Sequence, residues 1–196
     1  MEKRQFLSSG LVLGTLLIPT LKEASATIQN ASAQIILTIT GDIKHVNRDK
    51  SDVVKDQLMH KQGVHFERAY TFALSDLENL RAKTISPTLE YDARIHQLSG
   101  PRLMDVLELV GVNKTKHSSI IFHGIDGYSP EISLALAEKY DYILATKLDG
   151  QLLSVGGFGP LFAIYDADRL TEIAQKPLNQ RFDKCPWGLY CIEVVA

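Results

Sequence analysis

The chain has 196 residues, of which 45% are hydrophobic and 22% are charged, and its formal net charge is −2. This is the composition of an ordinary globular protein, and the length suffices for one domain with a substantial core. Its 21 basic and 23 acidic residues give no sign of the basic face that a nucleic-acid-binding protein needs. We therefore expect a single globular domain with no nucleic-acid partner.

The first 26 residues have the pattern of an export signal. Lys3 and Arg4 form a short positive start, and residues 6–19 form an apolar or small-residue run that is too short to span a bilayer comfortably. An A-x-A motif that ends at Ala26 fits the cleavage pattern of signal peptides. We therefore predict a signal peptide over residues 1–26, with Thr27 as the first residue of the mature chain. A second A-x-A motif, residues 31–33, leaves Gln34 open as an alternative start.

Export would place the mature domain, residues 27–196, in the periplasm. Two alternatives stay open at this point. The leader could be a retained N-terminal anchor, which its short apolar run does not favour. Its start, residues 3–7 (KRQFL), is also one residue away from a twin-arginine pattern, and a twin-arginine leader would carry a protein that folds before export.

Alternation and apolar runs predict a succession of short strands with helices between them. A polar stretch, residues 42–63, carries apolar residues at helical spacing and is expected to be an insertion with a short helix. Residues 132–140 are expected to form a helix, and residues 167–184 a loop-rich return that begins with a helical piece. The expected strands are residues 34–41, 64–73, 88–98, 118–122, 142–148, 151–155, 161–165 and 187–195.

Two further helices have recognisable ends. Residues 75–78 (SDLE) have the capping-box pattern, which predicts a helix that starts at Asp76 and stops before Pro87. The clearest helix has Pro101 at its first position and an apolar face that follows the i, i+3, i+4, i+7 rule. Gly111 is expected to end this helix as a left-handed cap.

A glycine-rich stretch around residue 150 organises the predicted sheet. Asp149-Gly150 is the dipeptide that a two-residue hairpin turn prefers, because both turn positions need positive φ. Gly156, Gly157 and Gly159 then allow a sharp bend before the next strand. Strands and helices alternate irregularly and include a hairpin. We therefore predict an α+β fold, a single domain with mixed β-sheets and short helices.

Several short motifs occur along the chain in a fixed order. They are the opening strand that ends at Gly41, the helix of residues 74–80, residues 98–103 (LSGPRL) before the helix that ends at Gly111, residues 126–128 (DGY), 143–145 (ILA), 149–150 (DG) and 159–161 (GPL), and Trp187. Together they resemble the molybdopterin-binding domain of the sulfite-oxidase family, in particular its small stand-alone bacterial members. The resemblance covers residues 34–195 and implies the sulfite-oxidase molybdopterin-domain fold.

Two departures from the pattern of that family bear on the reaction. Its catalytic members hold molybdenum through a cysteine thiolate just upstream of the LSGPRL helix, and residues 84–100 contain no cysteine. Ser or Thr cannot replace a soft thiolate ligand without changing the chemistry. Catalytic members also carry arginine after the G-x-P-L motif, where this chain has Phe162. The resemblance therefore implies the fold, and the departures argue against a sulfite-oxidase or sulfoxide-reductase reaction.

A loop between predicted elements carries His123, Asp126 and Tyr128, and binding groups are often placed on such loops. With Arg94 and His96, these side chains are expected to line a polar cofactor- or ligand-binding pocket. The alternative is structural, because the Asp-Gly dipeptide at position 126 is also a turn signal and the tyrosine would then pack.

The glycine bend is a second candidate site. Gly156, Gly157 and Gly159 would let backbone N–H groups face a phosphate, although a plain bend between two strands explains them equally well. No spacing of the H-x-x-x-H, C-x-x-C or H-E-x-x-H type occurs, and neither a P-loop nor a G-x-S-x-G motif is present. We therefore expect no metal site and assign no catalytic residue.

The two cysteines, Cys185 and Cys191, are six residues apart near the C-terminus. In an oxidising compartment, two cysteines favour a disulfide. Cys191 lies in a predicted strand, however, where a free buried thiol is accommodated equally well. The sequence leaves both possibilities open.

The expected fold without its thiolate ligand leads to a functional prediction. We expect an exported protein that has no cofactor and acts as a non-catalytic ligand-binding or partner module. Its expected ligand is a small anionic or pterin-like molecule, and its expected partner is a membrane-anchored sensor or redox protein. The alternative is a molybdopterin-dependent oxidoreductase with atypical metal ligation.

Overall fold

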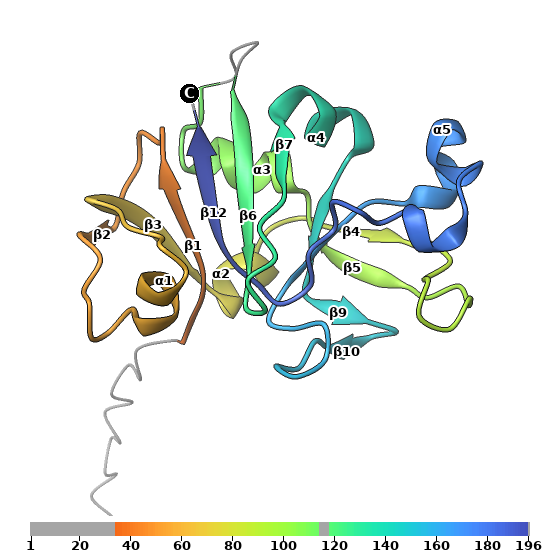
Figure 1. Ribbon diagram of the computed structural model, residues 1–196, viewed down its shortest axis with the longest axis horizontal. Helices are drawn as coiled ribbons and strands as arrows, with labels where there is room; N and C mark the ends of the chain where they lie inside the picture. Colours follow the sequence, from red (N-terminus) through yellow and green to blue (C-terminus); the bar gives the residue numbers. More distant parts are fainter. Residues whose placement is uncertain (1–33, 114–117, 196) are drawn as a thin grey trace, which may run out of the picture. The chain divides into compact units, whose positions relative to one another are not determined.

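The computed structural model describes residues 34–113 and 118–195, and the predicted signal peptide lies outside them. Figure 1 shows these residues as sheets of short strands connected by short helices, which confirms the predicted α+β class. The described strands are β1 (Ile35–Gly41), β2 (Arg48–Asp49), β3 (Arg68–Ala73), β4 (Ala82–Ile85), β5 (Leu98–Pro101), β6 (Ser119–Gly124), β7 (Glu131–Ser133), β8 (Ile143–Ala145), β9 (Lys147–Leu148), β10 (Gln151–Leu152), β11 (Phe162–Ile164) and β12 (Leu189–Val195). The described helices are α1 (Gln57–Lys61), α2 (Leu74–Glu78), α3 (Leu103–Leu109), α4 (Leu134–Tyr140), α5 (Thr171–Ala174) and the 3-10 helices η1 (Ala167–Arg169) and η2 (Leu178–Gln180).

The larger sheet has six strands in the order β2-β3-β1-β12-β6-β7. Strand β12 pairs in parallel with β1 and antiparallel with β6, so the last strand of the chain lies in the middle of the sheet (Figure 1). The other pairs of this sheet are antiparallel. The predicted mixed sheet is therefore confirmed.

A second sheet has four antiparallel strands in the order β10-β9-β5-β4, and β8 pairs separately with β11. The predicted hairpin turn is confirmed, because Asp149 and Gly150 have φ of 48° and 80°, as this turn requires. The predicted strand 142–148 is divided between two sheets, because β8 pairs with β11 while β9 pairs with β5 and β10.

The main hydrophobic core contains residues of both larger sheets and of α2, α3 and α4. Helix α3 buries Leu103, Val106 and Leu107, the face that its spacing predicts. Each fully buried leucine of this kind contributes roughly 1.5–3 kcal/mol to the stability of the fold. In the part of the chain that the structure describes, no helix has the length and apolar character needed to cross a membrane.

Two glycines of the predicted motifs have clear structural reasons. A Cβ atom at Gly100 would lie 1.9 Å from the carbonyl oxygen of Leu144, so only glycine allows β5 to approach β8 this closely. Gly111 has φ of 70° and donates its N–H to the carbonyl of Glu108 at 2.9 Å. It is therefore the predicted helix cap.

Helix α2 begins and ends earlier than predicted. Ala73 is its N-cap, and the Asp76 carboxylate accepts the backbone N–H of Ala73 at 2.8 Å. Asp76 therefore has the reciprocal role that the capping-box pattern gave to Glu78. The helix ends at Glu78, and the residues that were expected to continue it form β4 at the edge of the second sheet.

Three further boundaries differ from the prediction. Residues 88–98 are mostly a loop with one bridge from Thr88 to Ile95, because the chain turns back there with Ala93 at φ of 56°. Pro101 ends β5 and does not open α3, because its backbone is still paired with β4. The first residues of the predicted helix 132–140 belong to β7, which pairs with β6, so α4 begins only at Leu134.

Both cysteines are free and buried. Cys185 packs in the main core, whereas Cys191 packs in a smaller cluster with Met59, Val64 and Phe66. Of the two alternatives that the sequence left open, the structure therefore has the free buried thiols.

Candidate functional site

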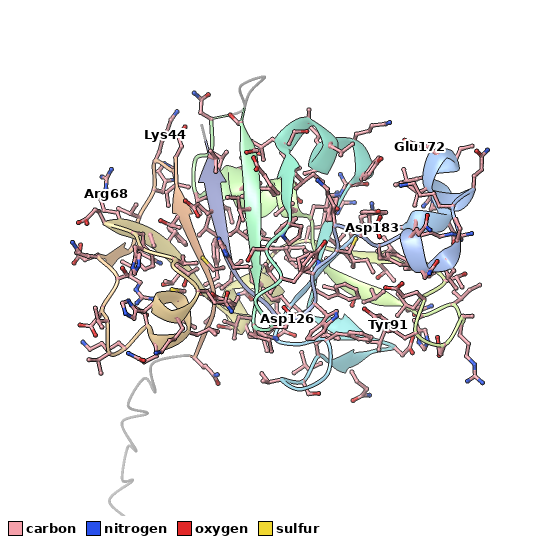
Figure 2. The ribbon with its side chains drawn as sticks, viewed as in Figure 1. Lys44, Arg68, Tyr91, Asp126, Glu172 and Asp183 are labelled. Atoms are coloured by element: carbon pink, nitrogen blue, oxygen red, sulfur yellow. The ribbon has the colours of Figure 1, made fainter. Side chains whose placement is uncertain are left out.

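Three connections of the fold surround a pocket of about 350 Å³. They are the β4–β5 connection, the β6–β7 connection and the segment that leads from η2 into β12. Figure 2 labels one side chain from each connection, namely Tyr91, Asp126 and Asp183. We call this hollow the loop pocket, and its lining residues are Glu90, Tyr91, Asp126, Tyr128, Phe182, Asp183, Cys185, Pro186 and Trp187.

The β6–β7 connection is a tight turn that positions Asp126 and Tyr128. The Oδ1 atom of Asp126 accepts the backbone N–H of Tyr128 at 3.0 Å, and Gly127 has φ of 89°. One oxygen of Asp126 therefore builds the turn, as the structural alternative predicted, while the residue still lines the loop pocket. The Tyr128 hydroxyl donates to the carbonyl of Asp183 and so ties this turn to the segment before β12.

The β4–β5 connection presents Glu90 and Tyr91 to the loop pocket. Just before them, the backbone N–H of Thr88 donates to Oδ2 of Asp168 at 2.6 Å, which anchors the connection. The ring of Tyr91 lies 5.1 Å from the ring of Phe158 in the glycine bend. Such a distance is typical of a favourable aromatic pair, so the bend supports one wall of the pocket.

The segment before β12 is fixed by hydrogen bonds from the core and from the glycine bend. The hydroxyl of the fully buried Tyr142 donates to the carbonyl of Lys184 at 3.0 Å. The backbone N–H of Gly188 donates to the carbonyl of Phe158 at 2.9 Å. Trp187, directly before this glycine, therefore reaches the pocket from a well-held backbone.

Three carboxylates and no basic side chain line the loop pocket. Burial raises the pKa of Glu90, and the negative charge of Asp183 raises it further. Burial also raises the pKa of Tyr128, with the charge of Asp183 as the next cause. The pKa of Tyr91 is raised by burial and then by Glu90, while a hydrogen bond with Trp187 acts in the opposite direction. The pocket therefore concentrates negative charge that its own lining does not compensate.

Cys185 is the thiol of the lining, and its side chain packs in the main core. Its Sγ atom lies 4.0 Å from the Tyr142 hydroxyl, and burial raises the pKa of the thiol to about 12. Within residues 34–113 and 118–195, no group of three or more His, Cys, Asp or Glu side chains is arranged to hold a metal ion.

His96 and Arg94 belong to the β4–β5 connection but do not line the loop pocket. The Nδ1 atom of His96 lies 2.7 Å from Oδ2 of Asp149, and its Nε2 lies 3.0 Å from Oδ2 of Asp92. These hydrogen bonds, with that to Asp149 first, raise the pKa of His96. Arg94 is exposed. The structure does not bring these two residues to the DGY turn, and ligand binding by them stays a prediction.

His123 lies in β6 and not in the predicted loop, because its backbone pairs with β12. Its side chain is buried, with Nδ1 at 3.2 Å from the Ser129 hydroxyl oxygen. Its Nε2 atom lies 3.6 Å from Glu193, too far for a good hydrogen bond, and burial lowers the pKa of the ring. His123 therefore supports the DGY turn as a neutral side chain and does not line the pocket.

Two N–H groups of the glycine bend form hydrogen bonds within the bend itself. Gly157 and Gly159 both donate to the carbonyl of Ser154, at 3.0 and 2.9 Å, and Gly156 has φ of 94°. A Cβ atom at Gly159 would lie 2.7 Å from the Ser154 backbone, so the bend requires glycine there. These contacts fit the plain-bend alternative, and phosphate binding by the three glycines stays a prediction. The bend reaches the loop pocket through Phe158.

The site prediction included Asp126 and Tyr128 and missed the other seven lining residues. Trp187 stood among the motifs of the resemblance, but no chemistry was assigned to it. Glu90 and Asp183 are 93 residues apart in the numbering, and no local pattern links them. Their proximity results from the return of the chain to β12, in the middle of the larger sheet.

A family comparison is consistent with this geometry. Residues 56–161, more than half of the chain, match the model of the oxidoreductase molybdopterin binding domain. The chain belongs to this family. The matched region contains four residues of the loop pocket, those of the β4–β5 and β6–β7 connections, and it ends before the segment that leads into β12.

A solved structure shows the same fold. The sulfane dehydrogenase SoxCD from Paracoccus pantotrophus superposes with a TM-score of 0.54 at 13% sequence identity. The alignment covers 81% of this chain but only 37% of the SoxCD chain, so this protein corresponds to little more than a third of that chain. The match confirms the predicted sulfite-oxidase-like fold. No curated protein matches the sequence.

The prediction that this protein has no cofactor is wrong. It rested on the missing cysteine, and membership of a molybdopterin-binding family points instead to a molybdopterin-type cofactor. The missing thiolate bears on how a metal is held, and it does not bear on binding of the pterin ring. Metal ligation and binding of the pterin ring therefore depend on different groups, and the lining of the loop pocket can be compared with each.

The loop pocket fits one part of such a cofactor. The rings of Tyr91, Tyr128 and Trp187 offer flat apolar surface to a heterocycle, and the carboxylates accept hydrogen bonds from its amino and ring N–H groups. The phosphate of molybdopterin meets no basic side chain in this lining. The thiol of this lining, Cys185, is buried in the main core with its Sγ 4.0 Å from the Tyr142 hydroxyl, so it points to the core contact and not to an open metal position. The residues therefore fit the pterin ring, and they fit neither its phosphate nor a thiolate-held molybdenum.

Proposed function

We propose that this chain is an exported, non-catalytic member of the molybdopterin-binding oxidoreductase family that binds a pterin-type ligand in the loop pocket. The observation that carries the proposal is the lining itself, which joins aromatic rings and carboxylates to a thiol that is buried in the main core. Molybdopterin with its metal supplies oxygen-atom and electron transfer in redox enzymes. The residues of this pocket bind and orient a ring, and they do not provide the ligation that such chemistry needs.

The composition of the purified protein tests the proposal. The full chain, with its own leader, is produced in a host that makes molybdenum cofactor and is purified from the periplasmic fraction. We expect an N-terminus at Thr27, a pterin released on denaturation and far less than one molybdenum or tungsten per chain. We also expect no turnover with sulfite or sulfoxides. Near-stoichiometric metal together with robust turnover would instead support an oxidoreductase with atypical metal ligation.

We further propose that a membrane-anchored sensor or redox protein recognises the ligand-bound domain. Three exposed apolar side chains, Ile95 in the β4–β5 connection, Leu152 in β10 and Val155 between β10 and the glycine bend, support such a contact. A photo-crosslinker at Val155 should capture one membrane protein in intact cells, whereas the same group at exposed Lys61, in α1, should not. Capture that is equal at both positions would count against this partner surface.

A further inference from the structure

We infer that the ligand of the loop pocket is a flat, amino-substituted heterocycle that carries no phosphate, such as the ring of a pterin without its phosphorylated side chain. This inference rests on the proposed function and names the ligand class of the same site. It follows from three properties of the lining, namely its hydrogen-bond acceptors, its charge and its rings.

The polar atoms of the lining mostly accept hydrogen bonds. The carboxylate oxygens of Glu90 and Asp183 accept hydrogen bonds, and Asp126 keeps Oδ2 free of the turn that its Oδ1 builds. The Tyr128 hydroxyl has already donated its hydrogen to the carbonyl of Asp183, so it too can only accept. A ligand that satisfies these groups must bring several N–H donors, and the amino-pyrimidine edge of a pterin has them.

The basic side chains nearest in sequence to the lining are engaged elsewhere. Lys184 directs its Nζ to the carbonyl of Glu131 at 2.6 Å. Arg181 donates from Nη1 to Oδ1 of Asp168 at 2.8 Å and from Nη2 to the carbonyl of Ala174 at 2.7 Å. Neither side chain lines the pocket. A phosphate would therefore meet three carboxylates without a cation, and like charges at such short range repel strongly.

The apolar part of the lining selects a ring over a small ion. Tyr91, Tyr128 and Trp187 come from the three different connections and form aromatic walls around the hollow. Phe158 extends the row behind Tyr91, with ring centroids 5.1 Å apart. Rings and acceptors together match a flat heterocycle with amino groups.

Calorimetric titration of the mature protein tests each property with a matched compound. The probes are 6-hydroxymethylpterin, its phosphate ester, and 6-hydroxymethyllumazine, which has an oxo group in place of the 2-amino group. We expect the phosphate ester and the lumazine each to bind about tenfold more weakly than the pterin, the effect of one charged or hydrogen-bonding contact. Asp183→Asn removes one negative charge from the pocket, so it should reduce the difference in affinity between the pterin and its phosphate ester. Glu90→Gln should have the same effect.

Asp141→Asn is the control, because Asp141 makes its ion pairs with Lys83 and Arg102 outside the loop pocket. It should leave all three affinities unchanged. A phosphate ester that binds as tightly as the pterin would overturn the inference and leave the proposed function standing. Equal binding of the lumazine would overturn the requirement for amino donors. Failure of all three compounds to bind would instead contradict the proposed function itself.

Discussion

The loop pocket and a second hollow beside β4 and α4 are similar in size, about 350 and 400 Å³, and opposite in charge. The second hollow is lined by Lys83, Arg102, Lys139 and Arg169. Asp141 lies among these cations, where it pairs with Lys83 and lies 3.5 Å from the Nε of Arg102. The loop pocket has no such counter-charge, because its carboxylates face aromatic rings and one another.

On the proposed function, this difference separates charges that serve the fold from charges that serve a ligand. In the second hollow, Asp141 gives Lys83 and Arg102 a counter-charge within the lining. In the loop pocket, burial and then the charge of Asp183 raise the pKa of Glu90, and groups of this kind gather at functional sites. Variants that change the residues of one hollow leave the other hollow intact, so the unchanged hollow is the control.

The largest effect is expected from charge reversal in the loop pocket. Asp183→Lys removes an acceptor and adds a cation that competes with the ligand's donors, so affinity for 6-hydroxymethylpterin should fall about 100-fold. The backbone carbonyl that accepts from Tyr128 is unchanged, so the fold should be retained. Calorimetry measures the affinity, and thermal unfolding followed by circular dichroism checks the fold. An affinity within threefold of the wild type, a margin of about 0.6 kcal/mol, would show that the loop-pocket carboxylates do not bind the ligand.

The second-largest effect is a loss of stability expected from a change in the second hollow, beside β4 and α4. Asp141→Asn leaves Lys83 and Arg102 without their carboxylate and should lower the free energy of unfolding by about 1 kcal/mol. Asparagine tolerates the positive φ of 54° at this position, so the backbone itself adds little to the loss. Chemical denaturation measures the change. Pterin binding that weakens together with stability would show that the two hollows are not independent.

A smaller, pH-dependent effect is expected at Glu90. Its raised pKa means that it takes up a proton at higher pH than an ordinary glutamate. Ligand affinity should therefore weaken as the pH falls through this raised pKa, because an acceptor and a charge are lost. The folded protein holds this proton more tightly than the unfolded chain, so the same protonation favours the fold. Titrations across this range, with Glu90→Gln as the flat reference, should show affinity falling while stability at this site rises.

The smallest effect concerns His96, whose charge is paired outside both hollows. Its pKa is raised from 6.5 by Asp149 and then by Asp92. The stabilisation is therefore complete below the unfolded pKa and is lost as the pH rises through the raised folded value. His96→Gln should lose more stability at about pH 5.5 than at about pH 8.5, values on either side of an ordinary histidine pKa. Arg94→Gln is the control in the same connection, and an equal loss for His96→Gln at both pH values would disprove the pairing.

Local features of the fold could be predicted from the sequence. The turn at Asp149-Gly150 and the buried face of α3 depend on neighbours within a few residues, and both are confirmed. Asp126 and Tyr128 were found for the same reason, since one turn carries both. The strand boundaries around residues 82–101 were missed because pairing partners, and not local propensity, decide them there.

The rest of the site depends on contacts that no local pattern encodes. Glu90 and Asp183 come together only because β12 returns to the middle of the larger sheet. The wrong cofactor prediction has a different origin. The sequence shows that a thiolate ligand is missing, but the aromatic and acidic groups that suit a pterin ring become visible only when three connections are assembled.

The single tryptophan of the chain allows the most direct test. Because Trp187 lines the loop pocket, its indole N–H gives one resonance from the proposed site in a ¹⁵N-labelled sample. Addition of 6-hydroxymethylpterin should shift this resonance in a saturable way in the wild type and in Asp141→Asn, but not in Asp183→Lys. Pterin binding that leaves the indole resonance unmoved would contradict the assignment of the ligand to the loop pocket.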